Sequence, residues 1–379
     1  MRSSWKRLFI HFTQLQALLK KAIINLLKFL IFLGVGLGIL YLVFQKQNAA
    51  YQEDCLNNNV PIEDCSLINK ILTDFQGANY FWILIVLLAF VVSNFSRAAR
   101  WRMLLKPLGY VPKFSNAFLS IMIGYFANLG LPRLGEVVRA GTIARYEQIP
   151  VEKAMGTIVT DRIVDVLSML TVVGIAFLLE YDTLWNYISG ALEAREEGEA
   201  ASGGVSWLWI IMGIGVLGVL IAFLFRKQLM QTAIFKKIQS ILLGFWEGIS
   251  SVLKLEKPGL FLLHSINIWL MYYLMTYLCF FAFAPTADLG PVAGLMVFVF
   301  GAFGILIPSP GGMGTYHLLV VQALAIYQVS GDDAFSFANI IFFSVQIGCN
   351  VLIGLVALLL LPILNRSYEP KHPLQMAAS

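Results

Sequence analysis

Two short groups of charged residues interrupt an otherwise apolar sequence. The first lies in the stretch NLGLPRLGEVVR and contains Arg133, Glu136 and Arg139. Their spacing of three places them on one side of a helix that would begin after Pro132. An arginine guanidinium can hold two oxygens of a phosphate or carboxylate at once. Anion recognition is therefore the first chemistry that this group indicates.

The second group contains Asp161, Arg162 and Asp165, within a long apolar run. Asp161 and Asp165 are four apart and share a helix face, and Arg162 can pair with Asp165. Charges inside a membrane are costly and usually face the interior of a helix bundle. We therefore expect the two groups to meet across a polar cavity, and we include Asn128 in this candidate substrate-binding set.

The pattern leaves three interpretations open. One is a binding site for an anionic headgroup, from a phospholipid or a lipid-linked phosphate. Another is a salt-bridge network that only fastens two helical segments together. The last is a proton-coupled role for Glu136, Asp161 or Asp165. No catalytic grouping, phosphate-binding loop or dinucleotide fingerprint occurs, and the four histidines are scattered. We therefore predict no catalytic residue, metal, cofactor or nucleic-acid partner.

The elements that must position these residues are membrane helices. Of 379 residues, 58% are hydrophobic and 13% are charged, about half the charged share of a soluble domain. This composition predicts an all-α integral membrane protein. Six apolar runs are long enough to cross about 30 Å of hydrocarbon: 26–44, 80–96, 155–179, 207–225, 261–283 and 335–361. We expect one membrane domain over 26–365, after a basic amphipathic segment (1–25) suited to an anionic leaflet and before a short cytoplasmic tail (366–379).

Two further apolar runs, 114–131 and 292–307, each end at a proline-glycine segment. Lys and Arg collect on the cytoplasmic side of a membrane. With both termini in the cytoplasm, Lys46, Lys70 and Arg195 are the only basic residues in the outside segments. This distribution holds only if neither run crosses completely, so both are predicted to be re-entrant hairpins in the cell inner membrane.

The two hairpins belong to a predicted repeat, 80–179 and 261–361, in which Pro132 aligns with Pro308 and Gly135 with Gly311. The hairpins would enter from opposite sides, as in the inverted repeats common among transporters. The second helix break contains Pro308, Ser309, Pro310, Gly311, Gly312, Gly314 and Thr315. A helix beginning near Thr315 would point its N-terminal amides into the membrane and attract an anion. The alternative is a tight loop that caps two packed helices.

Two cysteines, Cys55 and Cys65, lie in the loop expected outside. A disulfide between them is plausible in an oxidising compartment, and two free thiols are the alternative.

Three stretches together carry a family resemblance: GYFANLGLPRLGEVVRAGTIAR, VEKAMGTIVTDRIVDVL and IPSPGGMGTYH. They resemble the flippase-like transmembrane domain of bacterial lysylphosphatidylglycerol synthases and its stand-alone relatives, over residues 20 to 365. The resemblance implies handling of lipid headgroups and translocation of lipids, with membrane lipids as partners. The full synthases carry an aminoacyl-transfer domain after the membrane part, whereas this sequence ends shortly after its last apolar run, so lysine transfer is not expected. A lipid translocator is the first hypothesis, and a membrane accessory protein or enzyme acting on headgroups is the alternative.

Overall fold

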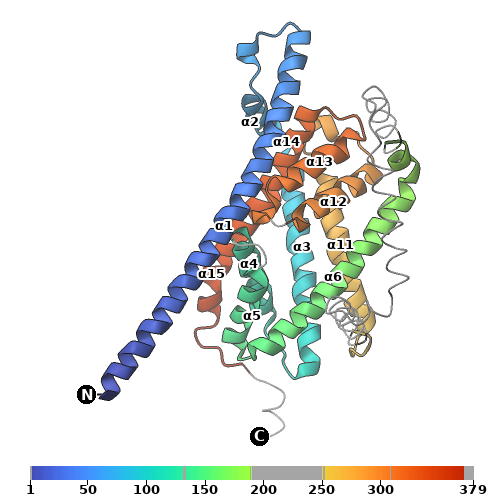
Figure 1. The fold of residues 1–379 in the computed structure, drawn as a ribbon. Helices are drawn as coiled ribbons and strands as arrows, with labels where there is room; N and C mark the ends of the chain where they lie inside the picture. The colour runs from blue at the N-terminus through green and yellow to red at the C-terminus, as the bar shows by residue number, and fades with distance from the viewer. Residues whose placement is uncertain are drawn as a thin grey trace, which may run out of the picture.

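The described part of the chain is built from helices (Figure 1). The computed structural model describes residues 2–130, 134–187, 189, 250, 252–307 and 309–370. In these ranges five helical stretches are long and apolar enough to cross a membrane: Leu30–Asn57, Tyr80–Leu108, Val151–Leu179, Pro258–Phe280 and Gly331–Leu364. They overlap five of the six predicted spans. The remaining span, 207–225, lies outside the described residues.

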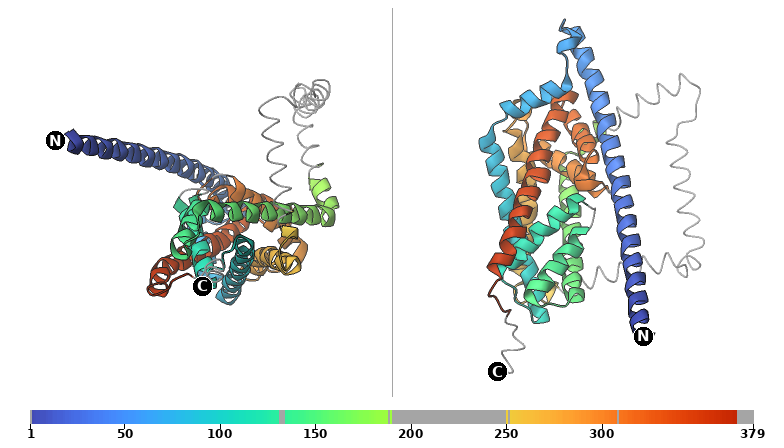
Figure 2. Two further views of the ribbon diagram at one scale, coloured as in Figure 1. Left: turned by 90° about the horizontal axis from the view of Figure 1, so that it is seen from below. Right: turned by 90° about the vertical axis from the view of Figure 1, so that its left-hand side faces the viewer.

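Helix α1 (Arg2–Asn57) is one continuous helix of 56 residues. At 1.5 Å per residue it is about 84 Å long, roughly twice the thickness of a bilayer with its headgroups. The left view of Figure 2 shows its N-terminal half projecting away from the other helices. The predicted boundary after residue 25 therefore does not coincide with a break in the helix. That the first segment lies on an anionic leaflet remains a prediction.

The centre of the molecule is the packing of α3 (Tyr80–Leu105) along α11 (Pro258–Phe280), with α6 (Val151–Leu179) beside them. The sequence predicted that the span corresponding to α3 ends at residue 96, and that the basic residues after it lie in a cytoplasmic loop. The helix instead continues to Leu105. It continues because Arg97 and Arg100 are buried inside the bundle rather than turned toward water.

Two pairs of shorter helices complete the bundle: α4 (Phe114–Gly130) with α5 (Leu134–Glu147), and α12 (Pro291–Leu306) with α13 (Thr315–Ala325). In both pairs the backbones touch. A Cβ added at Gly135 would collide with the carbonyl oxygen of Gly124, and one added at Gly304 would lie 2.7 Å from the Cα of Tyr316. Figure 1 shows α4 and α5 in the lower half of the molecule and α12 and α13 in the upper half.

A 3₁₀ turn, Pro310–Gly312, precedes α13. Gly311 and Gly312 have φ angles of 61° and 82°, in the left-handed region that favours glycine. Gly314, with φ at 80°, faces the carbonyl oxygen of Gly36 so closely that a Cβ there would collide with it. Helix α1 therefore packs directly on the turn.

The last helical stretch contains α14 (Gly331–Ile341), a π-helical segment (Phe342–Cys349) and α15 (Asn350–Leu364). The end of the described chain is bound to the base of α4 and α5. The side chains of Asn365 and Asn116 exchange hydrogen bonds of 2.7 and 2.9 Å, and Tyr368 Oη donates to Glu147 Oε2 at 3.0 Å. These contacts fasten the end of the described chain to the first helix pair.

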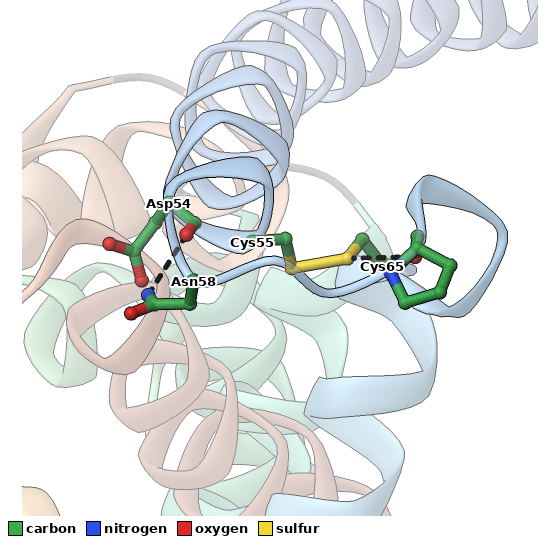
Figure 3. Close-up of a disulfide and its surroundings, with 5 residues drawn as sticks. Asp54, Cys55, Asn58 and Cys65 are labelled. Carbon is green, nitrogen blue, oxygen red and sulfur yellow. Dashed lines mark hydrogen bonds between the residues drawn. A yellow bond between two sulfur atoms is a disulfide. The ribbon is translucent and has the colours of Figure 1, made fainter.

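A short amphipathic helix, α2 (Leu67–Gly77), follows α1 across a small loop. Cys55, near the end of α1, and Cys65, just before α2, are joined by a disulfide (Figure 3). Their Cα atoms lie 6.3 Å apart, within the usual range for a disulfide. The two cysteines are ten positions apart, so the bond closes a short loop between α1 and α2.

Mass spectrometry of the native protein without reduction is expected to show Cys55 and Cys65 bonded to each other. The peptides that hold Cys279 and Cys349 provide the matched control, because both thiols are free and buried. Closing a short loop contributes about 2–4 kcal/mol to stability, chiefly by constraining the unfolded chain. Finding Cys55 and Cys65 alkylated under native conditions would contradict the prediction.

Candidate functional site

The charged residues of the middle of the chain form one interior group, which we call the charge cluster. It draws side chains from three helices that meet in the lower half of Figure 1, with α11 lining it on a further side. Its members are Arg97 and Arg100 of α3, Glu136 and Arg139 of α5, and Asp161, Arg162 and Asp165 of α6.

Asp161 is the most enclosed carboxylate of the charge cluster, with none of its surface exposed. Its Oδ1 lies 2.6 Å from Arg100 Nη2. Its Oδ2 lies 3.2 Å from Arg139 Nη1 and 3.3 Å from Arg97 Nη1. A buried charge is tolerated only when it is paired and hydrogen-bonded. The three arginines provide that pairing, so Asp161 joins α3, α5 and α6.

Asp165 lies one turn further along α6 and shares two of these arginines. Arg97 Nη1 donates to its Oδ2 at 2.8 Å, and Arg100 Nη2 donates to its Oδ1 at 2.6 Å. Arg162 Nη1 is 3.5 Å from Oδ2, as the spacing of three along the helix predicted. Asp165 thus connects the enclosed part of the charge cluster to its more open side.

The open side is the pair of Arg162 and Glu136, whose Nη2 and Oε1 atoms are 2.7 Å apart. The Arg162 side chain is 41% exposed and that of Glu136 is 23% exposed, whereas those of Arg100 and Asp161 are fully buried. A ligand entering the charge cluster would therefore meet this ion pair before it met Asp161.

Neutral polar groups surround the arginines. Arg97 Nη2 donates to Tyr272 Oη at 3.1 Å, and Arg100 Nη1 donates to Ser265 Oγ at 3.2 Å. The guanidinium of Arg139 lies 3.8 Å from the ring centroid of Trp101, a favourable cation–π contact. These contacts hold the guanidinium planes in fixed orientations, as anion recognition requires.

Positive charge exceeds negative charge in the charge cluster. Four guanidinium groups face three carboxylates, which leaves one positive charge in excess. Several buried polar atoms also lack a hydrogen-bond partner: the donors Nε and Nη2 of Arg139 and Nε of Arg97 and Arg100, and the acceptors Oε2 of Glu136 and Oδ1 of Asp161. Buried polar groups in folded proteins are nearly always satisfied. Unpaired donors beside an excess positive charge can bind the oxygens of an anion.

The structure brings together five of the residues singled out in the sequence: Glu136, Arg139, Asp161, Arg162 and Asp165. Arg133 lies outside the described residues. Asn128 makes a contact of another kind, because its Oδ1 accepts a hydrogen bond of 2.7 Å from the backbone N–H of Gly135. The described contact of Asn128 therefore supports the beginning of α5 rather than the ion pairs.

The second helix break has its own polar network. Thr315 Oγ1 lies 2.6 Å from the carbonyl oxygen of Gly304 and 3.2 Å from Ser309 Oγ. A Cβ added at Gly311 would lie 3.3 Å from Leu129, so the turn reaches the end of α4. Pro308 lies outside the described residues. The Thr315 hydroxyl contacts protein groups, and whether the turn binds an anion remains a prediction.

Arg97 and Arg100 are the members of the charge cluster that sequence reasoning missed. They were assigned to a cytoplasmic loop because they follow an apolar run. Ser93, Arg97 and Arg100 are spaced by four and three on the same helix, and this spacing is the signal that indicates an inward polar face. No group of three or more His, Cys, Asp or Glu side chains able to hold a metal occurs in the ranges that the structure describes.

A comparison with protein families decides the family of this chain. Residues 65–364 match the model described as the lysylphosphatidylglycerol synthase TM region. The chain belongs to this family. The matched region of this family member contains every residue of the charge cluster and leaves out most of the disulfide loop and all of α1.

This family member is also similar to the UPF0104 membrane protein MJ1595 of Methanocaldococcus jannaschii. The two are 29% identical over 106 residues, which are 27% of this chain and 32% of the relative. The similarity thus spans about a third of the relative's length. No solved structure matches the chain.

Proposed function

We propose that this protein binds an anionic lipid headgroup at the charge cluster and carries the lipid across the cell inner membrane. The headgroup would be that of an anionic phospholipid or a lipid-linked phosphate. The observation that carries the proposal is the excess positive charge of the charge cluster together with the unpaired donors of Arg139. A phosphate oxygen would satisfy both.

Charge and access favour binding over a purely structural network. In a network that only joins helices, the carboxylates would be expected to balance the arginines and the donors would be paired. The partly exposed pair of Arg162 and Glu136 gives the enclosed arginines a route to the lipid or the aqueous phase. A headgroup phosphate that displaces Glu136 from Arg162 would enter next to Asp165 and reach Arg139.

The helix pairs support movement of the lipid. Within each pair, α4 with α5 and α12 with α13, the two helices touch at a glycine. The two pairs lie toward opposite ends of the bundle (Figure 1). We infer that they are re-entrant hairpins of an inverted repeat, which enter from opposite sides of the membrane. Non-helical backbone at membrane depth is tolerated where it is buried in protein or lines a cavity. The turn before α13 meets the end of α4, where Gly311 faces Leu129.

Cysteine labelling in intact cells tests this topology. A cysteine at the exposed position Arg145 is expected to react only from the cytoplasm, and one at the exposed position Ala325 only from outside. The native Cys279 and Cys349 are buried and provide the unreactive background. Labelling of both positions from the same side would rule out the inverted repeat.

Reconstitution into liposomes tests the function. A membrane-impermeant quencher added outside reaches only the lipid in the outer leaflet. Labelled phosphatidylglycerol that begins in the inner leaflet should therefore be quenched faster than in protein-free liposomes. It should also be quenched faster than labelled phosphatidylcholine in liposomes that contain the protein. Arg139→Ala, which removes the unpaired donors, should lose this acceleration. Equal rates for the anionic and zwitterionic lipids would contradict recognition of an anionic headgroup. Binding without faster exchange would contradict translocation.

A further inference from the structure

A groove of about 500 Å³ lies between α1, α2 and α14, apart from the charge cluster. Its wall is almost wholly hydrocarbon: Leu37, Tyr41 and Phe44 from α1, Ile68 and Leu72 from α2, and Phe335 from α14. The Asn339 side chain also lines it, but its amide already donates to the carbonyl oxygen of Phe335 at 2.8 Å. The volume falls in the range of ligand-binding cavities, roughly 300–1,000 Å³.

Helix α2, which forms one wall of the groove, is held at both ends and in the middle. The disulfide of Cys55 and Cys65 fixes its beginning to the end of α1 (Figure 3). After its end, the N–H of Asn79 donates to the carbonyl oxygen of Ala282 at 2.8 Å. In the middle, Lys70 Nζ lies 2.6 Å from Asp333 and 3.5 Å from Asp332 at the start of α14. The groove is therefore built into the fold.

The central ion pairs also persist at any physiological pH. Burial alone would lower the pKa of Lys70, but its hydrogen bonds and charge interactions with Asp333 and Asp74 raise that pKa above its ordinary value. Lys70 therefore stays charged, and α2 stays attached to α14.

The position of the groove indicates what fills it. Its α1 residues lie within Leu30–Asn57, a stretch apolar enough to span a membrane. Tyr41, Ile68 and Leu72 are all more than half exposed, so the groove is open on one side. At membrane depth the surrounding material is hydrocarbon, and an unfilled apolar space would lose dispersion contacts along its whole wall. A flexible hydrocarbon chain matches both the shape and the chemistry.

We propose that the groove binds one acyl chain of a phospholipid from the leaflet on the α2 side, as a resident lipid. This site goes beyond the headgroup site of the proposed function and does not depend on it. It also gives the disulfide and the Lys70 ion pairs a shared purpose, which is to hold α2 at a fixed distance from α1 and α14. The resident chain would exchange more slowly than the lipids around the rest of the protein.

Photo-crosslinking in nanodiscs tests the site on the unmodified protein. The probe is a phosphatidylglycerol that carries a photoreactive group in its acyl chain, present at a small fraction among unlabelled phospholipids. After preloading and a chase with unlabelled lipid, peptides that contain Tyr41 and Leu72 should retain label several-fold more than the peptide around Leu178. Leu178 is the matched control, because it is apolar and 78% exposed on α6. Equal retention at the two places would mean ordinary boundary lipid and would overturn the proposal.

Two variants sharpen the test. Leu72→Trp should fill the groove and lower its labelling several-fold, whereas Leu178→Trp should leave it unchanged. Cys55→Ser should release the beginning of α2 and speed the loss of label during the chase. If Leu72→Trp folds as judged by its elution profile and keeps full labelling, the chain does not lie in this groove. If that variant fails to fold, the chase on the unmodified protein still decides.

Discussion

Asp161→Ala is expected to lose about 3–5 kcal/mol of stability, the largest effect of any single change in the charge cluster. The carboxylate is fully buried and lies within 3.3 Å of three guanidinium groups. Its removal would take away the carboxylate that Arg139 contacts, and would leave Arg97 and Arg100 with Asp165 alone, inside the bundle. The measurement is the midpoint of unfolding of the purified protein in a series of denaturing detergent mixtures.

Glu136→Ala is the matched control for this change. It also removes a carboxylate from an ion pair with arginine, but the pair is partly exposed, and such pairs contribute about 0–1 kcal/mol. The two variants should therefore differ by several kilocalories per mole. Equal losses would mean that Asp161 does not hold the three helices together.

Arg139→Lys is expected to fold normally and yet bind an anionic headgroup about 10- to 100-fold more weakly. A lysine can keep the contact that Arg139 Nη1 makes with Asp161 at 3.2 Å. It has no counterpart for the buried Nε and Nη2 donors that lack a partner. A hydrogen bond to a charged group is worth about 1.5–3 kcal/mol, and 1.4 kcal/mol is tenfold in affinity. Titration with phosphatidylglycerol, followed by native mass spectrometry, measures the loss.

Arg162→Lys is the control for this second change, because Arg162 is 41% exposed and a lysine can also pair with Glu136. It should bind the headgroup nearly as well as the unmodified protein. If Arg139→Lys also binds normally, Arg139 only fastens α5 to α6 and the headgroup proposal fails at this residue. In that case, exchanging the residues at positions 139 and 161 should restore much of the stability that Arg139→Asp alone loses.

Much of the helical framework could be predicted because its cause is local. An apolar run of about 20 residues must become a helix in a bilayer, since every backbone polar group has to be satisfied within the segment. Five of the six predicted spans overlap helices of the required length and apolarity. The glycines before α13 were also identifiable, because a proline-glycine segment cannot continue a helix. The predicted end at residue 96 was wrong, because hydropathy alone treats arginine as a loop residue.

The composition of the candidate site was only partly predictable. Glu136 and Arg139 on one helix and Asp161 and Asp165 on another carried the right periodicity. Two further partners of the aspartates, Arg97 and Arg100, lie 61 to 68 residues away along the chain from the carboxylates that they contact. The residues next to those arginines do not determine which other helix packs against them.

The sequence by itself determined that this chain is a membrane protein, where five of its apolar helices lie, and which types of charge accompany them. Those properties follow from the balance between apolar side chains and water at each position. Only the tertiary structure decided that Arg97 and Arg100 turn inward, that Asn128 supports α5, and that α2 closes a groove beside α1. These outcomes depend on which helix surfaces touch. A buried charge takes whichever opposite charge the packing brings within about 3 Å, because the cost of leaving it unpaired in hydrocarbon exceeds that of extending or bending a helix to reach it.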